Sequence, residues 1–159
     1  MITDKLKTWQ EIDSIALDFH IHGRKVVFTN GCFDIIHAGH VKYLAEAKKL
    51  GDVLFLGLNS DQSVRRLKGD SRPINSEADR ASVLSALRSI DYVVVFGEDT
   101  PENIIRTIRP DVLVKGGDYK PADIVGYDIV TAREGIVVTV PYIEGFSTTN
   151  IIERMQPPL

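Results

Sequence analysis

Apolar runs that are typical of buried strands alternate along this chain with segments that have the spacing of helices. Short apolar runs predict strands at 25–29, 53–58, 92–96, 112–114 and 136–140. Apolar residues three and four positions apart predict helices at 8–20, 39–50, 61–67, 77–89, 101–108 and 148–155. Strands that alternate with helices are typical of a parallel sheet covered on both faces.

The alternation therefore predicts an α/β fold, a Rossmann-like, doubly wound, five-stranded parallel sheet with helices on both faces. We expect a single domain over residues 1–159, in which residues 1–23 form an N-terminal helical extension. A doubly wound sheet binds its ligand at the carboxyl ends of the strands, so the segments that follow the strands are the first candidates for chemistry.

Composition narrows the class of protein. The hydrophobic fraction of 43% and the charged fraction of 26% are typical of a soluble globular chain. The sequence contains no apolar run of about 18 residues, so it predicts no membrane span. Residues 1–10 lack the apolar core of a secretory signal. Cys32, the single cysteine, excludes an internal disulfide and fits a reducing cytoplasm. With a net charge of −3, we expect a cytoplasmic protein with no nucleic-acid or membrane partner.

Two histidines follow the first predicted strand. His37 and His40 lie at a strand-to-helix crossover, where the first N–H groups of the helix are unpaired and its dipole favours an anion. Their spacing puts both imidazoles on one face of the first turn, and Gly39 lets a ligand approach the backbone. The segment predicts a phosphate site. Ordinary helix-capping histidines are one alternative, and a zinc site without a supporting cysteine cluster is another.

A second polar segment precedes the last predicted helix. Gly145 permits an unusual backbone turn, and Ser147 and Thr148 are good helix N-caps. Taken alone, the segment is explained equally well by a capped terminal helix.

Together, the segments 31–40 (GCFDIIHAGH) and 145–149 (GFSTT) resemble the signature of the cytidylyltransferase-like nucleotidyltransferases. The resemblance implies that His37 and His40 are catalytic, because they would hold the triphosphate of CTP or ATP and stabilise the charge on the transferring phosphate. Tyr142 stands where the cytidylyltransferase branch usually has an arginine, which weakens the case for CTP. The implied nucleotide contacts are Asn30, Gly31, Cys32, Phe33, Gly39, Gly145, Phe146, Ser147, Thr148 and Thr149.

Four cations within residues 65–72 predict a mobile basic loop after a short helix. In an acidic chain such a cluster is where phosphates would be neutralised. We expect Lys68 to be a catalytic phosphate contact and Arg66 a substrate contact. A solvated surface loop is the alternative.

Two glycines follow the fourth predicted strand and permit a close ligand approach at the functional edge of the sheet. The resemblance implies that this strand exit faces the base and the acceptor, with Asp118 as a nucleotide contact and Lys115 as a substrate contact. It also implies substrate contacts for Asp34 and Arg80. An ordinary turn would explain the glycines equally well, and a structural ion pair would explain Arg80.

The combination of segments 59–61, 66–73, 115–121 and 147–152 is more specific, and it resembles the D-glycero-β-D-manno-heptose 1-phosphate adenylyltransferases. The implied reaction transfers AMP from ATP to the heptose 1-phosphate and gives ADP-heptose and pyrophosphate, for lipopolysaccharide core or a related glycan. Mg²⁺ would accompany ATP, with no metal held by the protein alone.

The same resemblance implies a homodimer or higher homo-oligomer. It also implies a separate heptose 7-phosphate kinase in the pathway, because the chain has no room for a kinase. Two other functions stay open. One is a cytidylyltransferase that acts on glycerol 3-phosphate or another small phosphorylated acceptor, and the other is a nucleotide-binding module without turnover.

Overall fold

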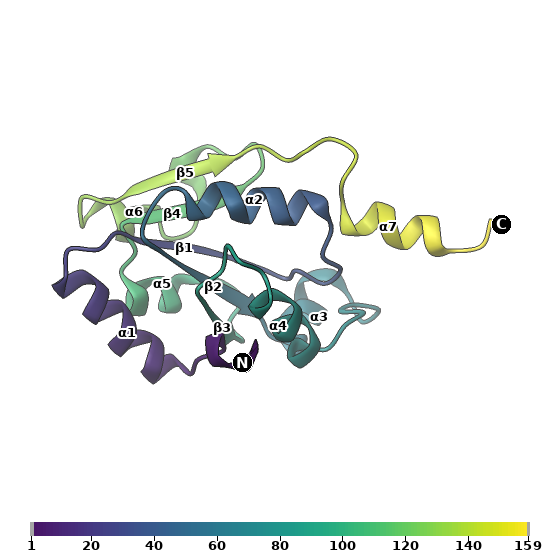
Figure 1. The fold of residues 1–159 in the computed structure, drawn as a ribbon. Helices are drawn as coiled ribbons and strands as arrows, with labels where there is room; N and C mark the ends of the chain where they lie inside the picture. The colour runs from purple at the N-terminus through teal and green to yellow at the C-terminus, as the bar shows by residue number, and fades with distance from the viewer. Residues whose placement is uncertain (1, 159) are drawn as a thin grey trace.

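Five parallel strands form one sheet in the order β3-β2-β1-β4-β5 (Figure 1). The computed structural model describes residues 2–158, and residues 1 and 159 of the predicted domain lie outside the described residues. The order changes direction at β1, which pairs with both β2 and β4, so the switch point of the sheet lies beside β1. The strands are β1 (Val26–Gly31), β2 (Val53–Asn59), β3 (Tyr92–Phe96), β4 (Val112–Gly116) and β5 (Ile136–Val140).

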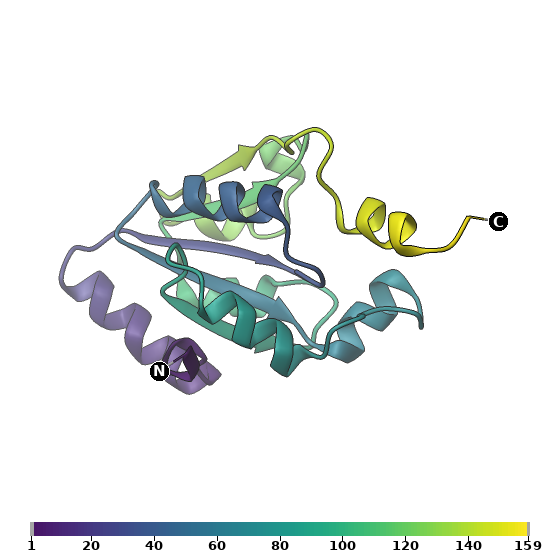
Figure 2. The same cartoon turned by 45° about the vertical axis from the view of Figure 1, so that its right-hand side comes forward.

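Helices cover both faces of this sheet (Figure 2), which confirms the predicted fold class. Apolar residues of α1, α5 and α6 pack on one face, and those of α2 and α4 pack on the other. The helical elements are η1 (Ile2–Lys5), α1 (Trp9–Ile21), α2 (Ala38–Lys48), α3 (Asp61–Lys68), α4 (Glu77–Ser85), α5 (Glu102–Ile108), η2 (Pro121–Asp123), α6 (Tyr127–Thr131) and α7 (Thr148–Met155).

Two apolar cores form because neighbouring residues of a strand point to opposite faces. Phe28 of β1 belongs to the core under α1 and α5, whereas Val27 belongs to the core under α2 and α4. Every residue of β2 is buried, as expected for a parallel strand covered on both sides. These cores hold the carboxyl ends of the strands in fixed positions for the site.

The predicted boundaries differ from the observed ones where elements are short. The crossover helix α6 was missed, because five residues are too few to show a helical period. It is held to the sheet by Val130, which is fully buried. The predicted helix 77–89 was too long, since α4 ends at Ser85 and the chain turns before Ile90 becomes buried at the entry to β3.

The N-terminal helix α1 packs directly on the sheet. Thr8 and Glu11 form a capping box at its start, in which the Glu11 N–H donates to Thr8 Oγ1 over 3.2 Å. Ile12 and Ala16 are fully buried, and the Trp9 indole N–H donates to the carbonyl of Val95 over 2.9 Å. This segment therefore contributes to the core of the domain.

The last helix, α7, has no buried residue. In Figures 1 and 2 it stands out from the layered body, on the side where β1 ends and α2 begins. Its side chains are thus available to a ligand at the carboxyl edge of the sheet. Within residues 2–158, no helix has the length and apolar character to cross a membrane.

Candidate active site

The two histidines cap the start of α2 and each other. His37 is the N-cap residue, and its Nδ1 accepts the backbone N–H of His40 over 3.4 Å. In return, Nδ1 of His40 accepts the backbone N–H of His37 over 3.3 Å, and the rings stack with centroids 3.8 Å apart. Because Nδ1 is the acceptor in each neutral ring, the proton lies on Nε2. Both Nε2–H groups are therefore available as donors to a ligand.

The histidine rings are neutral at neutral pH. Burial, together with a smaller effect of the nearby His37, lowers the pKa of His40 to about 4. Burial also lowers the pKa of His37. An uncharged imidazole still donates a hydrogen bond, so the pair suits phosphate oxygens without adding positive charge.

Gly39 is required by the close packing around the pair. A Cβ at this position would lie 2.9 Å from the ring of His37 and 3.0 Å from Cβ of Phe146. The ring of Phe146 stacks on His37 with centroids 6.2 Å apart, and the ring of Phe33 lies 5.2 Å from that of His40. Phe33 has a left-handed φ of 45°. One aromatic ring thus packs beside each histidine.

The start of α7 contacts the histidine loop. Ser147 is the N-cap and accepts the N–H of Asn150 over 3.0 Å. The hydroxyl of Thr148 donates to the carbonyl of Ile35 over 3.1 Å, which ties α7 to the loop before α2. Gly145 has a φ of 86°, which favours glycine.

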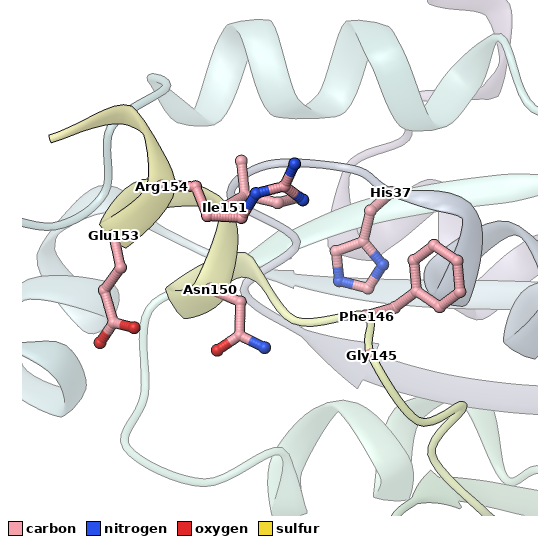
Figure 3. A pocket seen from close by; sticks show the side chains of 7 residues that line it. All are labelled: His37, Gly145, Phe146, Asn150, Ile151, Glu153 and Arg154. Atoms are coloured by element: carbon pink, nitrogen blue, oxygen red, sulfur yellow. The ribbon is translucent and has the colours of Figure 1, made fainter.

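The histidine loop and α7 enclose a groove of about 360 Å³ (Figure 3). This volume lies within the range of small-molecule sites. The lining residues are His37, Gly145, Phe146, Asn150, Ile151, Glu153 and Arg154. Three of them were predicted. The four on α7 were missed, although the helical spacing of Asn150, Ile151 and Arg154 from Ser147 could have identified those three.

Arg80 requires a correction, because the structure gives it a structural role. It is only 1% exposed, and its guanidinium donates to the carbonyls of Asn75, Cys32 and Asn59. It also forms an ion pair of 2.9 Å with Asp61. These contacts join the exits of β1 and β2, so Arg80 supports the site from beneath instead of touching the substrate.

Asp34 also differs from its predicted role. It is 3% exposed, and its carboxylate accepts the N–H groups of Ile74 and Asn75 and a 2.7 Å bond from Arg72. Burial would raise its pKa, but these donors hold the pKa below its usual value. Asp34 therefore anchors the end of the basic loop and has no surface for a substrate.

The other predicted cations are divided between two places. Arg66 donates to Asp99 over 2.8 Å and to the carbonyl of Gly97, so it ties α3 to the loop after β3 and does not line the groove. Lys68 is exposed and, within residues 2–158, forms no hydrogen bond or ion pair. Its charge acts on Lys115, whose pKa is lowered mainly by burial.

The remaining predicted contacts lie around the strand exits. Asn30 and Gly31 end β1, and Cys32 follows, half-buried, with a thiol pKa raised by burial. Asp118 is exposed after β4, and Thr149 is exposed in the first turn of α7. Their contacts with a nucleotide stay predictions.

Comparison with known proteins identifies the family. The model of the family described as cytidylyltransferase-like matches residues 28–154. The chain belongs to the cytidylyltransferase-like family. This confirms the resemblance found in the two motifs, and it supports the prediction of a nucleotidyltransferase enzyme.

Curated relatives are similar over nearly the whole chain. The bifunctional protein HldE of a Nitratiruptor species is 57% identical over 95% of this chain and 32% of its own length. That of Syntrophotalea carbinolica is 62% identical over 84% of this chain and 27% of its own length. The chain thus spans about a third of the length of the curated relatives it matches.

Two solved structures are similar to this chain in fold. The lipopolysaccharide core biosynthesis protein from Thermoplasma volcanium is 30% identical, with a TM-score of 0.63 over 76% of this chain and 98% of that one. The pantoate–β-alanine ligase from Francisella tularensis is 14% identical, with a TM-score of 0.64 over 92% of this chain and 72% of that one. The second likeness shows the fold alone.

Proposed function

We propose that this chain transfers AMP from ATP to D-glycero-β-D-manno-heptose 1-phosphate and gives ADP-heptose and pyrophosphate. The observation that carries the proposal is the stacked pair of His37 and His40, with His37 facing α7 across one groove. Family membership supports the reaction class. The segments 66–73 and 115–121, which resemble the heptose 1-phosphate adenylyltransferases, support the choice of nucleotide and acceptor.

The proposed step is an in-line displacement at the α-phosphorus. An oxygen of the acceptor phosphate forms the new P–O bond while the bond to pyrophosphate breaks, and the electron pair leaves with pyrophosphate. Since the acceptor oxygen is already ionised near neutral pH, no general base is required, and a neutral His40 suffices. Catalysis then depends on positioning and on donors to the developing charge.

The donors come from both sides of the groove. Nε2–H of His37 and His40 would bind phosphate oxygens, and the unpaired first-turn N–H groups of α2 and α7 would add to them. Lys68 and Lys115 would bind the acceptor phosphate by their charge. In this proposal, the neutral donors would bind the transferring phosphate, and the cations of the basic loop and the β4 exit would bind the acceptor.

Mg²⁺ enters the proposal as a companion of ATP. Residues 2–158 contain no cluster of three or more His, Cys, Asp or Glu side chains that could hold a metal ion. A magnesium ion that arrives with ATP would therefore take its ligands from phosphate oxygens and water, as Mg²⁺ commonly does. When bound, it would neutralise part of the triphosphate charge.

Pyrophosphate release tests the proposal. ATP and CTP are each offered with both anomers of heptose 1-phosphate, with mannose 1-phosphate as the acceptor that lacks the seventh carbon, and with glycerol 3-phosphate. We expect the highest kcat/KM for ATP with the β-heptose. Preference for CTP with glycerol 3-phosphate would support a cytidylyltransferase instead. Absence of release with every pair would support a binding module.

The proposal extends to the surroundings of the enzyme. We place it in the cytoplasm as a homodimer or higher homo-oligomer, so light scattering should give a mass of at least twice 17.7 kDa. The acceptor already carries its anomeric phosphate, so a kinase reaction on the heptose has to precede this step.

A further inference from the structure

The outer edge of β5 is uncovered in the part of the chain that the structure describes. Within residues 2–158 this strand pairs with β4 alone, and in Figure 1 it is the outermost strand of the sheet. The opposite edge, at β3, is covered by the N-terminal segment, because Leu6 forms a parallel bridge with Val93 and the N–H of Lys7 donates to the Val93 carbonyl over 2.8 Å. An uncovered edge offers unpaired N–H and C=O groups to another strand.

The side chains of β5 are those of a strand that is paired on both sides. None of its five residues is buried, whereas three of the five residues of β3 are, and Ile136 is 54% exposed. All five are β-branched, and the strand contains no charged residue and no proline. Edge strands are commonly protected from pairing by charges or proline. This strand has neither, so its own composition does not prevent pairing.

The hydrogen bonds to β4 determine which backbone groups of β5 point outward. The N–H of Ile136 donates to the residue before β4 over 2.9 Å, and the carbonyl of Val140 accepts the N–H of the residue after β4 over 3.0 Å. The direction of the backbone groups alternates along a strand. The N–H and C=O groups of Val137 and Thr139 therefore point away from the sheet.

A second copy of β5 satisfies these outward groups in a single register. Around a two-fold axis at Val138, antiparallel pairing sets Val137 of each copy opposite Thr139 of the other, and every outward N–H and C=O group has a partner. A shift of the register by two residues in either direction leaves a carbonyl unpaired. Pro141 has no N–H to offer, and the N–H of Gly135 already donates to a carbonyl of α6.

The same register brings apolar side chains together. Val138 and Val140 pack against the core on the α2 side of the sheet, and Ile136 lies on that side as well, because side chains alternate along a strand. Pairing around Val138 sets the exposed Ile136 of each copy beside Val140 of the other. Three apolar pairs would thus continue the core across the two-fold axis.

The charges beyond the ends of β5 favour the antiparallel direction. Arg133 precedes the strand and Glu144 follows it, and both side chains are exposed and form no hydrogen bond or ion pair within the described residues. Glu134 lines a separate pocket with Arg24 and Lys25. Antiparallel pairing brings the end with Arg133 to the end with Glu144, whereas parallel pairing would bring like charges together. Such exposed pairs add little affinity but contribute to orientation.

We propose that two copies of this chain pair antiparallel through β5 and form one continuous sheet of ten strands. The inference rests on the homo-oligomer of the proposed function, for which it names the surface, and it is independent of the reaction. Val138→Lys should raise the Kd of the dimer by about 100-fold or more, because like charges would then face each other at the axis. Val83→Lys, at an exposed position of α4, should leave this Kd unchanged.

Cysteine crosslinking tests the register with a substitution that is small enough to keep the strand folded. Across the axis the two copies of residue 138 form a non-hydrogen-bonded pair with Cα atoms about 4.5 Å apart, which a disulfide spans. Ile136→Cys is the matched control, since residue 136 lies on the same face and is 54% exposed, but its two copies would be about 14 Å apart along the strand. We expect mild oxidation to crosslink Val138→Cys, but not Ile136→Cys or the wild type with its half-buried Cys32.

Sedimentation equilibrium over a range of concentrations measures the Kd, non-reducing gels measure the crosslink, and circular dichroism checks that each variant is folded. A wild-type protein that stays monomeric at every concentration would overturn the inference. A dimer in which Val138→Cys does not crosslink, or in which Ile136→Cys crosslinks equally fast, would do the same and would place the interface elsewhere.

Pyrophosphate release separates this inference from the proposed reaction. If Val138→Cys crosslinks and the wild-type protein releases no pyrophosphate with any acceptor, the β5 interface stands and the proposed reaction fails. If the wild-type protein releases pyrophosphate as a monomer, the reaction stands and the interface fails.

Discussion

Replacing Arg80 should destabilise the domain at the base of the site. Its buried guanidinium donates to three carbonyls and to the carboxylate of Asp61. These acceptors lie at the exit of β1, the exit of β2, the start of α3 and the loop before α4. Arg80→Ala would leave all of them without their donor and Asp61 without its counter-ion.

The expected loss can be estimated from these contacts. A hydrogen bond from a charged donor contributes about 1.5–3 kcal/mol, and breaking a buried ion pair costs about 3–5 kcal/mol. Bonds made by one side chain are not additive. We therefore expect the free energy of unfolding to fall by about 3–5 kcal/mol, which lowers Tm by about 6–20 °C for a domain of this size. Arg80→Lys should recover little, because an ammonium lacks the planar fork.

Urea unfolding followed by circular dichroism measures the effect in Arg80→Ala and Arg80→Lys. Arg133→Ala is the control and should unfold like the wild type, because Arg133 is exposed and its side chain forms no hydrogen bond or ion pair within the described residues. A wild-type free energy of unfolding in Arg80→Ala, together with a raised KM for the acceptor, would refute the structural role. It would restore the substrate contact that the sequence resemblance implied.

Three further predictions concern the histidine pair. His40→Ala should lower kcat by about 100-fold or more, because it removes a donor to the transferring phosphate. His22→Ala, at an exposed histidine that caps the end of α1, should leave kcat unchanged. Steady-state pyrophosphate release measures kcat in both variants. Because the pKa of His40 lies at about 4, below its usual 6.5, the free energy of unfolding should be level above pH 6.5 and fall as the pH drops toward 4. Urea titrations across this pH range measure the slope of the free energy of unfolding. We expect the slope to flatten in His40→Ala, and a slope that persists in this variant would show that His40 is not its source. Gly39→Ala would place a Cβ 2.9 Å from the ring of His37 and should lower kcat/KM. Gly97→Ala should keep the wild-type kcat/KM, because the atom nearest to its added Cβ lies 3.5 Å away. Equal kcat/KM values in the two variants would contradict this packing argument.

Local patterns were sufficient for the architecture and for the centre of the site. Apolar runs such as 53–58 become strands because burial on both faces requires an apolar side chain at every position. The spacing of His37 and His40 predicted a shared face because the helical repeat places residues three apart side by side. Short elements such as α6 were missed because five residues show no period.

The roles of the charged residues could not be predicted in the same way. Arg80 and Asp34 have the chemistry of substrate contacts, and the resemblance implied that role for both. In the structure each is buried among protein donors or acceptors that are distant in sequence. Arg154 shows the reverse case, since no sequence motif indicated it as a site residue, but it lines the groove.

The sequence by itself determined the layered α/β fold, the family and the side-by-side placement of His37 and His40, because these depend on periodicity and on short segments whose residues are neighbours along the chain. Only the tertiary structure decided which cations are buried in protein contacts and which line the groove. A guanidinium binds whatever acceptor lies beside it, and the fold brings carbonyls and a carboxylate to Arg80 but open space and His37 to Arg154.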